Sequence, residues 1–173
     1  MTTEQKELFE KDPFVKAVLE LSEHSSIQLV GGSVIDILEK RKPKDYDLIG
    51  YVSSTLLKDL GLVYQYETKT AKTYRKDKLT VQILKTEKAD FDFKISEATL
   101  TIHAKLKKLT LSIDEQSFEN KILIPCDRCW TERRNAMNTL HRIVHWAAKG
   151  YKINGITYLS LLGVVGKNNN INS

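Results

Sequence analysis

The sequence predicts an α+β fold in which one mixed β-sheet has helices on one side and a small helical segment follows it. Short apolar runs bounded by turn residues recur between residues 27 and 113, which is typical of strands. A run of apolar residues with helical spacing lies between the first two of these strands. In the last third of the chain, the apolar residues recur with helical spacing. The 173 residues are enough to bury a hydrophobic core without disulfides.

Helix and strand alternate at the N-terminal end. Asp12-Pro13 predicts a helix start, because aspartate caps free amides and proline is tolerated in the first turn. Residues 27–30 predict a short strand that stops at Gly31-Gly32. Ser33 is expected to cap the helix that follows, which ends before the charged loop 40–44.

The middle of the chain predicts the rest of the sheet. A second strand is expected over residues 46–52, and Ser53 or Ser54 starts a short helix that ends near Gly61. Further strands, mostly antiparallel, are expected over residues 63–67, 79–84, 91–95 and 99–113.

The last third predicts one long helix, which begins at Asp127 and ends at Gly150. Its apolar residues fall on one face, and they are Trp130, Met137, Leu140, Val144 and Ala147. The polar residues 166–173 are expected to be disordered. We therefore expect a core over residues 1–115, a helical C-terminal extension packed on it over 116–155, and a partly disordered tail over 156–173.

The composition argues against a membrane protein and favours polyanionic partners. No apolar run reaches the ~20 residues that cross a bilayer, and the first residues lack the features of a signal peptide, so we expect a cytoplasmic protein. Two cysteines are too few for a disulfide framework. The net charge of +5 suits a nucleic acid, although a nucleotide alone would also satisfy it.

Asp45 and Asp47 are the strongest candidates for a catalytic metal site. Side chains two apart on a strand project from the same face, so the two carboxylates are expected side by side. Carboxylates of this kind, together with substrate phosphates, hold Mg²⁺ (or Mn²⁺). A metal pair there would lower the pKa of an attacking hydroxyl and stabilise a leaving pyrophosphate.

Gly31, Gly32 and Ser33 precede these aspartates by eleven residues and are candidate phosphate-binding residues. Glycines let the backbone approach phosphates, whose charge free amides at a helix start can meet. Each motif also has a plain structural interpretation, because a Gly-Gly pair is often only a turn and an Asp-x-Asp at a strand edge is often solvated. Their combination at this spacing favours function.

The combination resembles the signature of the polymerase-beta-like nucleotidyltransferase superfamily: a hydrophobic residue, Gly, Gly or Ser, a spacer, then Asp, hydrophobic, Asp, hydrophobic. Residues 31–36, Gly-Gly-Ser-Val-Ile-Asp, are also similar to the opening of the head domain in CCA-adding enzymes and bacterial poly(A) polymerases. Asp36 takes the position of that motif's aspartate, and a helix-capping role for it is equally open.

This resemblance implies a polymerase-beta palm-like sheet and a metal-dependent transfer reaction. A nucleoside monophosphate would move from an NTP, ATP among them, to a hydroxyl acceptor such as an RNA or tRNA 3′ end, with release of pyrophosphate. Asp45 and Asp47 would bind the metal, Asp92 would assist them, and Gly31, Gly32 and Ser33 would cradle the phosphates.

Two weaker similarities extend the resemblance toward the C-terminus. Residues 89–93 resemble a degenerate Arg-Asp-Phe-Thr motif, and the helix that ends at residues 146–151 is similar to the arginine-rich helix that closes the head domain. The resemblance implies that Arg134 and Arg142 reach the triphosphate or a nucleic acid backbone. A solvated helix face is the alternative for both arginines.

The chain also departs from the family pattern. Many members carry a third carboxylate on a neighbouring strand, and residues 81–83, where we place it, hold Gln82. Either Asp92 supplies that acid or the site works with two. The large helical body that grips tRNA in CCA-adding enzymes has no counterpart, which argues against a full CCA-adding activity.

Three alternatives remain open at the level of sequence. Gln82 favours a catalytically silent relative that binds a nucleotide or nucleic acid, and the small size also fits a conflict-system toxin that modifies tRNA or protein. Cys126-x2-Cys129 and His141-x3-His145 have nearly the spacing of a zinc site. In one straight helix, residues 129 and 141 lie ~18 Å apart, so we expect ordinary helix packing there.

Overall fold

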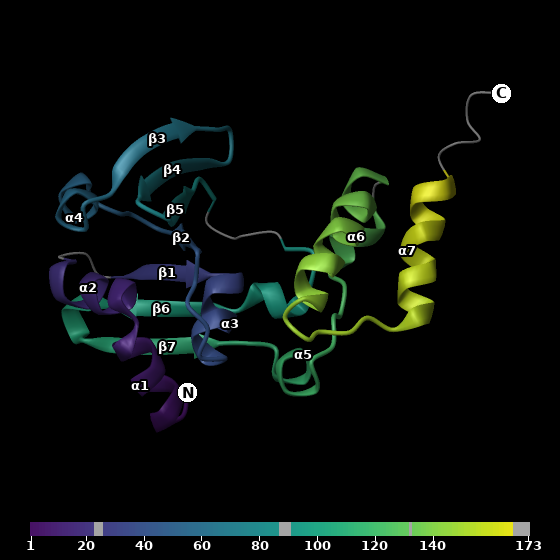
Figure 1. Ribbon diagram of the computed structural model, residues 1–173, viewed down its shortest axis with the longest axis horizontal. Helices are drawn as coiled ribbons and strands as arrows, with labels where there is room; N and C mark the ends of the chain where they lie inside the picture. Colours follow the sequence, from purple (N-terminus) through teal and green to yellow (C-terminus); the bar gives the residue numbers. More distant parts are fainter. Residues whose placement is uncertain (23–25, 87–90, 132, 168–173) are drawn as a thin grey trace. The chain divides into compact units, whose positions relative to one another are not determined.

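The computed structural model describes residues 1–22, 26–86, 91–131 and 133–167. They form two compact units, one of residues 1–89 with 98–112 and the other of residues 90–97 with 113–173 (Figure 1). The segment 90–97 thus belongs with the C-terminal part of the chain. The functional boundaries predicted at residues 115 and 155 stay predictions.

The first unit contains a seven-stranded mixed sheet, as the sequence predicts. Its order is β3-β4-β5-β2-β1-β6-β7, in which β2 and β5 are parallel and all other neighbours are antiparallel. The strands are β1 (Ile27–Val30), β2 (Asp45–Ile49), β3 (Val63–Glu67), β4 (Ala71–Lys76), β5 (Leu79–Leu84), β6 (Thr99–His103) and β7 (Lys108–Ser112).

The two faces of this sheet differ in character, because side chains alternate along each strand. One face is apolar and carries the buried Leu29, Leu48, Val81 and Leu100. The other face, which we call the polar face, is defined by the residues paired in register with them at alternate positions: Gln28, Asp45, Asp47, Thr80, Gln82, Thr99 and Thr101.

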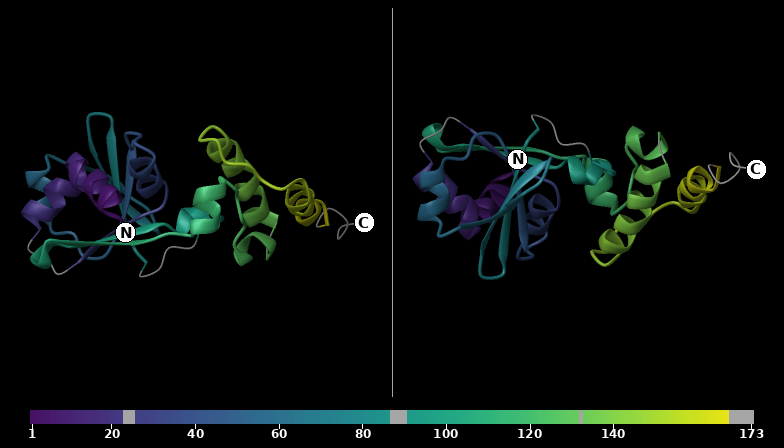
Figure 2. Two further views of the ribbon diagram at one scale, coloured as in Figure 1. Left: turned by 90° about the horizontal axis from the view of Figure 1, so that it is seen from below. Right: turned by 90° about the horizontal axis from the view of Figure 1, so that it is seen from above.

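The α-helices described in the first unit are α1 (Thr3–Lys11), α2 (Pro13–Leu21), α3 (Gly32–Leu38) and α4 (Ser54–Asp59). Helix α2 contacts β6, and α3 contacts β1 and β2, so helices cover one side of the sheet (Figures 1 and 2). Asp12 caps α2 as predicted, since its carboxylate accepts hydrogen bonds from the amides of Phe14 and Val15.

Several predictions about the first unit are wrong in detail. Ser33 does not cap α3, because Gly31 takes the N-cap position and Ser33 lies inside the helix. The strand expected over 99–113 is interrupted at residues 104–106 by a short 3-10 helix, after which Lys107 has a positive φ of 48°. Strand β4 and helix α1 were missed, because each has few buried side chains and therefore a weak apolar pattern.

The second unit is helical: η1 (Lys94–Glu97), α5 (Glu115–Asn120), η3 (Asp127–Trp130), α6 (Arg133–Ala147) and α7 (Gly155–Lys167). The strand predicted over 91–95 is wrong, since Phe93 makes only an isolated bridge to Pro125 and a 3-10 helix follows. Backbone bonds explain this, because the Asp92 carbonyl accepts from the Cys126 amide and Lys94 donates to the Ile124 carbonyl.

The C-terminal helices also differ from the prediction. The expected helix from Asp127 is a short 3-10 helix followed by α6, which ends near Gly150 as predicted, where φ is +87°. Helix α7 occupies residues that were assigned to the tail, and the expected disorder of residues 168–173 falls outside the described residues. Leu161 of α7 packs in a core with Cys129 and Ala136, which explains why this segment is helical. Among the described residues, no helix is long and apolar enough to span a bilayer.

Candidate active site

Asp45 and Asp47 lie on the same face of β2, as predicted. The residues between and after them, Tyr46 and Leu48, are 4% and 1% exposed and face the apolar side. Asp45 is exposed and Asp47 is half-buried. The two carboxylates therefore project side by side from a strand whose other side is fixed in the core.

Tyr46 anchors β2 between the two aspartates. Its hydroxyl donates a 2.8 Å hydrogen bond to the Asp12 carboxylate, and its ring stacks on Phe14 with a centroid distance of 4.4 Å. Burial, and then the Asp12 charge, raise the pKa of Tyr46 far above its ordinary value, so the hydroxyl stays a donor. The alternation of Asp45, Tyr46 and Asp47 already directs the tyrosine toward the core, but no local pattern points to its partner Asp12.

The register of the sheet identifies the neighbours of the two carboxylates. Val30 of β1 lies opposite Asp47 on one side, and Gln82 of β5 lies opposite it on the other. Thr80 lies opposite Asp45. Because paired residues share a face, glutamine occupies the neighbouring-strand position at which we expected a third carboxylate.

The donor set suits a metal ion that is shared with a substrate. The described residues contain no cluster of three or more side chains of His, Cys, Asp or Glu that could hold a metal ion by itself. Magnesium is usually bound by one or two carboxylates, with water and substrate phosphates completing its shell. Asp45 and Asp47 fit that mode of binding, in which the nucleotide supplies the remaining ligands.

The glycine turn lies at the end of β1, next to these carboxylates. Gly31 has a φ of 79°, which favours glycine, and its amide donates a 2.8 Å hydrogen bond to the Ala98 carbonyl. Ser33 is 5% exposed, and its hydroxyl lies 3.4 Å from the Val30 carbonyl, to which it donates. The Gly31 amide and the Ser33 hydroxyl are therefore engaged within the protein, which leaves the backbone around Gly32 as the candidate phosphate contact.

Asp36 does not face solvent as a simple helix cap. It lies within α3 and forms an ion pair of 2.9 Å with Arg41, in the loop after the helix. Arg41 also pairs with Glu39. These contacts give Asp36 a structural role in holding the loop that leads into β2.

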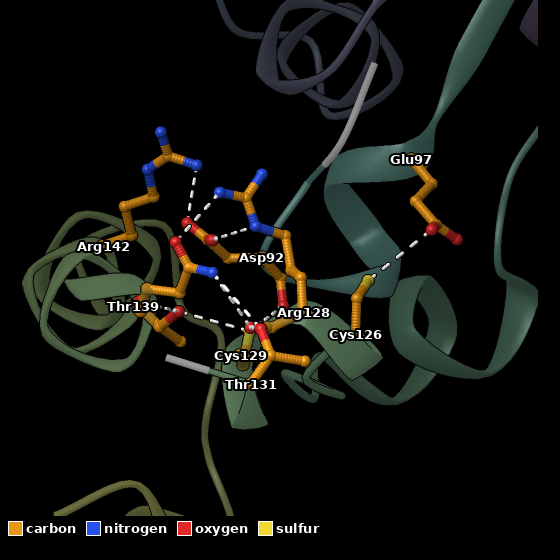
Figure 3. Close-up of polar contacts among 9 residues, drawn as sticks. Asp92, Glu97, Cys126, Arg128, Cys129, Thr131, Thr139 and Arg142 are labelled. Carbon is orange, nitrogen blue, oxygen red and sulfur yellow. Dashed lines mark hydrogen bonds and ion pairs between the residues drawn. The ribbon is translucent and has the colours of Figure 1, made fainter. Parts of the chain in front are cut away.

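Asp92, the third predicted carboxylate, lies in the second unit among arginines (Figure 3). It is 1% exposed, with Arg142 Nη1 at 2.6 Å and Arg128 Nε at 3.6 Å from its carboxylate oxygens. These ion pairs are poorly aligned, because neither carboxylate oxygen has a partner with hydrogen-bond geometry among the described residues. Its assistance to Asp45 and Asp47 stays a prediction.

The two arginines predicted to bind nucleotide, Arg134 and Arg142, both lie on α6. Arg142 extends from α6 to Asp92 and keeps 55% of its side chain exposed. Arg134 lies in the first turn of α6, and its side chain is outside the part of the chain that the structure describes. Arg128, which the sequence analysis passed over, is the second partner of Asp92, and its place in the Cys-Asp-Arg-Cys run gave no distinguishing signal.

The two cysteines have the properties of packed thiols. Cys129 donates to the Asp92 carbonyl at 3.0 Å and accepts from Thr139, while Cys126 donates to Glu97 (Figure 3). Burial raises the pKa of the Cys126 thiol to about 12, and Glu97 adds to this shift. Burial also raises the pKa of Cys129. Zinc needs thiolates, so these surroundings favour the packing interpretation over a zinc site.

Comparison with solved structures identifies the fold. The Thermotoga maritima CCA-adding enzyme in complex with tRNA superposes with a TM-score of 0.66 and 16% identity, over 92% of this chain and 44% of that one. A tRNA-processing enzyme with CTP gives a TM-score of 0.57 and 18% identity, over 80% of this chain and 43% of that one.

A third solved structure is similar over most of the chain. A tRNA nucleotidyltransferase with a primer tRNA and an incoming ATP analogue gives a TM-score of 0.56 and 17% identity, over 81% of this chain and 46% of that one. The chain thus spans less than half the length of each of these enzymes. In sequence, no protein-family model and no curated protein matches it. The resemblance inferred from the sequence motifs is confirmed for the fold: the chain has a nucleotidyltransferase fold like that of the CCA-adding enzymes.

Proposed function

We propose that this protein is a metal-dependent nucleotidyltransferase that transfers a nucleoside monophosphate from an NTP to the 3′ end of an RNA, with tRNA as the first candidate. The placement of Asp45 and Asp47 side by side on β2, in this fold, is the observation that carries the proposal. The solved structures with tRNA, CTP and an ATP analogue support the choice of nucleotide and acceptor.

The proposed reaction is a balanced phosphoryl transfer. The acceptor hydroxyl attacks the α-phosphorus of the NTP, the bond between the α-phosphorus and the bridging oxygen to the β-phosphorus breaks, and pyrophosphate leaves while the hydroxyl proton passes to solvent. Asp45 and Asp47 would hold Mg²⁺ or Mn²⁺, which would neutralise charge on the phosphates and on the attacking and leaving oxygens. Tyr46 keeps the two carboxylates in position through its bond to Asp12.

The first test is a labelling assay with matched variants. Wild-type protein is incubated with each NTP labelled at the α-phosphate, with Mg²⁺ or Mn²⁺, and with total cellular RNA and protein. We expect labelled RNA with the wild type, and a loss of at least about a thousandfold in Asp45→Asn and Asp47→Asn, because each removes a metal-binding charge.

Two controls make this assay specific. NTP labelled at the γ-phosphate should leave the RNA unlabelled, which separates nucleotidyl transfer from a kinase reaction. Asp59→Asn removes an exposed aspartate at the end of α4 and should keep full activity. Labelling that survives both Asp45→Asn and Asp47→Asn would disprove the proposed site.

A second function, binding of a nucleotide without turnover, is favoured by Gln82. Without an acid opposite Asp47 on β5, a bound nucleotide could be held while the second metal is bound too weakly for catalysis. Metal-dependent NTP binding by the wild type, with no labelled product for any NTP or acceptor, would favour this silent function. Labelled protein in place of labelled RNA would instead favour the conflict-system alternative.

A further inference from the structure

A pocket on the polar face of the sheet lies beyond Asp47 along β2. It has a volume of about 460 Å³, and Gln28, Ile49 and Leu84 are among the residues that line it. Gln28 is paired with Ile49, and Leu84 follows Ile83, which is paired with Leu48. The three side chains therefore come from neighbouring positions on β1, β2 and β5. Ile49 is two residues beyond Asp47 on the same face, about 7 Å along the strand.

The pocket and the glycine turn lie at opposite ends of the same stretch of β1. Along β1, Gln28 borders the pocket, Val30 lies opposite Asp47, and Gly31 follows. Since β2 runs antiparallel to β1, Asp45 lies toward the glycine turn and Asp47 toward the pocket. Along the polar face, Asp47 is therefore nearer the pocket than Asp45, and the glycine turn is at the Asp45 end.

This order matches the geometry of an in-line displacement. The attacking and leaving oxygens must lie on opposite sides of the α-phosphorus. If the β- and γ-phosphates lie toward the glycine turn, the attacking hydroxyl has to approach from the side of the pocket. We infer that this pocket binds the terminal nucleoside of the RNA acceptor and delivers its 3′ hydroxyl to the metal at Asp45 and Asp47, an inference that rests on the proposed function.

The lining of the pocket fits a base and a ribose better than a phosphate. Ile49 and Leu84 provide apolar contact for a base, and Ser26, Gln28 and Thr86 provide hydrogen-bonding groups around it. Lys85 is the cationic residue of the lining, and its ammonium is already occupied by Glu67 and by the Thr68 carbonyl.

The test uses one filling variant and one matched control on the full chain. Leu84→Trp places a large ring in the pocket. Thr110→Trp places the same ring on the polar face at an exposed position of β7, opposite Thr101, which in turn lies opposite Gln28. We expect Leu84→Trp to raise the KM for RNA at least tenfold and to leave the KM for NTP within twofold, with Thr110→Trp unchanged in both. Gln28→Ala, a milder change, should raise the KM for RNA severalfold.

A crosslinking experiment separates this inference from the proposed function. The probe is a single-stranded RNA oligonucleotide with a 4-thiouridine at its 3′ end, and crosslinked peptides are identified by mass spectrometry without NTP. We expect crosslinks to peptides that contain Gln28, Ile49 or Leu84, and their loss in Leu84→Trp while circular dichroism shows that the variant is folded.

The outcomes distinguish the two ideas. Transfer to RNA with an unchanged KM in Leu84→Trp and Gln28→Ala, or crosslinks to other peptides only, would overturn the pocket assignment and leave the transferase intact. Crosslinks at the pocket without any transfer would support the pocket as an RNA-end site and remove the proposed reaction. The absence of both transfer and pocket crosslinks would overturn both.

Discussion

At Gln82 the proposed metal site can be tested by the addition of a carboxylate, where the other variants remove one. It lies opposite Asp47 on β5, so a carboxylate at that position would join the existing pair on the polar face. Three acids close together repel one another without a metal and bind a divalent cation more tightly.

We therefore predict that Gln82→Glu lowers the Mg²⁺ concentration for half-maximal activity about tenfold, which corresponds to about 1.4 kcal/mol of binding free energy. A thermal-shift titration gives a second measurement that needs no activity: the variant should melt below the wild type in EDTA and gain more stability on addition of Mg²⁺. Gln82→Asn, which adds no charge, is the control. An equal Mg²⁺ response in all three proteins would show that β5 does not contribute to the metal site.

Asp92 is a buried carboxylate, and its charge is compensated by two arginines, so the stability of the fold depends on these ion pairs. Arg142 is its closer partner, at 2.6 Å, and removal of one partner of a buried charge leaves that charge poorly compensated. Because the Arg142 side chain is 55% exposed, water replaces part of the lost interaction.

We expect Arg142→Met to lower the free energy of unfolding by about 2 kcal/mol, measured by urea denaturation. Adding Asp92→Asn to that variant should recover part of the loss, since the buried charge is then gone. If the double variant is as unstable as the sum of the single changes, the ion pair is not coupled and Arg142 acts through packing alone.

At the scale of elements, the packing of helix α7 on the second unit depends mainly on the side chain of Leu161. Leu161 is fully buried against Cys129 and Ala136, while Leu159 is 65% exposed on the same helix. We predict that Leu161→Ala lowers the free energy of unfolding by about 2–4 kcal/mol, and that the matched Leu159→Ala changes it by less than about 0.5 kcal/mol. Hydrogen exchange read by mass spectrometry should show the loss of protection within residues 113–167. Equal effects of the two substitutions would contradict the packing of α7.

Cys126, the N-cap residue of the 3-10 helix η3, has a thiol whose titration affects the stability of the fold at high pH. The pKa of Cys126 is raised from 9.0 to about 12 by burial, so the folded protein keeps a proton that the unfolded chain loses. This contribution is complete below pH 9 and is lost as the pH rises toward 12.

We expect the melting temperature of the wild type to fall between pH 8 and pH 10.5 by about 2–4 °C more than that of Cys126→Ala. Differential scanning calorimetry at the two pH values measures this difference. Identical pH dependence in both proteins would mean that the thiol titrates normally in the folded state.

At the scale of the whole molecule, the net charge of +5 predicts how the acceptor binds. Binding of single-stranded nucleic acid releases counterions, so its affinity falls with salt by a slope of about −0.7 for each phosphate contacted. With two contacted phosphates, we expect the KM for RNA to rise about sevenfold between 50 and 200 mM NaCl, with a smaller change in the turnover number at saturating RNA. A KM independent of salt would point to an acceptor that is not a polyanion.

Local sequence rules predicted the parts of the fold whose chemistry is local. The Asp12 cap, the glycine turn after β1 and the shared face of Asp45 and Asp47 follow from capping, backbone freedom and strand alternation. The same rules failed at residues 91–95, because an alternating Phe-Asp-Phe pattern resembles a strand even where the backbone bonds to Cys126 and Ile124 instead.

The sequence by itself determined the fold class, the two carboxylates and the turn beside them, since each depends on residues close together in the chain. Only the tertiary structure decided that Tyr46 is held by Asp12 and that Asp92 belongs with Arg128 and Arg142, and the strand register fixed the expected neighbour Gln82 opposite Asp47. These contacts join residues far apart in sequence. Strand register and helix packing create them, and neither leaves a periodic signal in one chain.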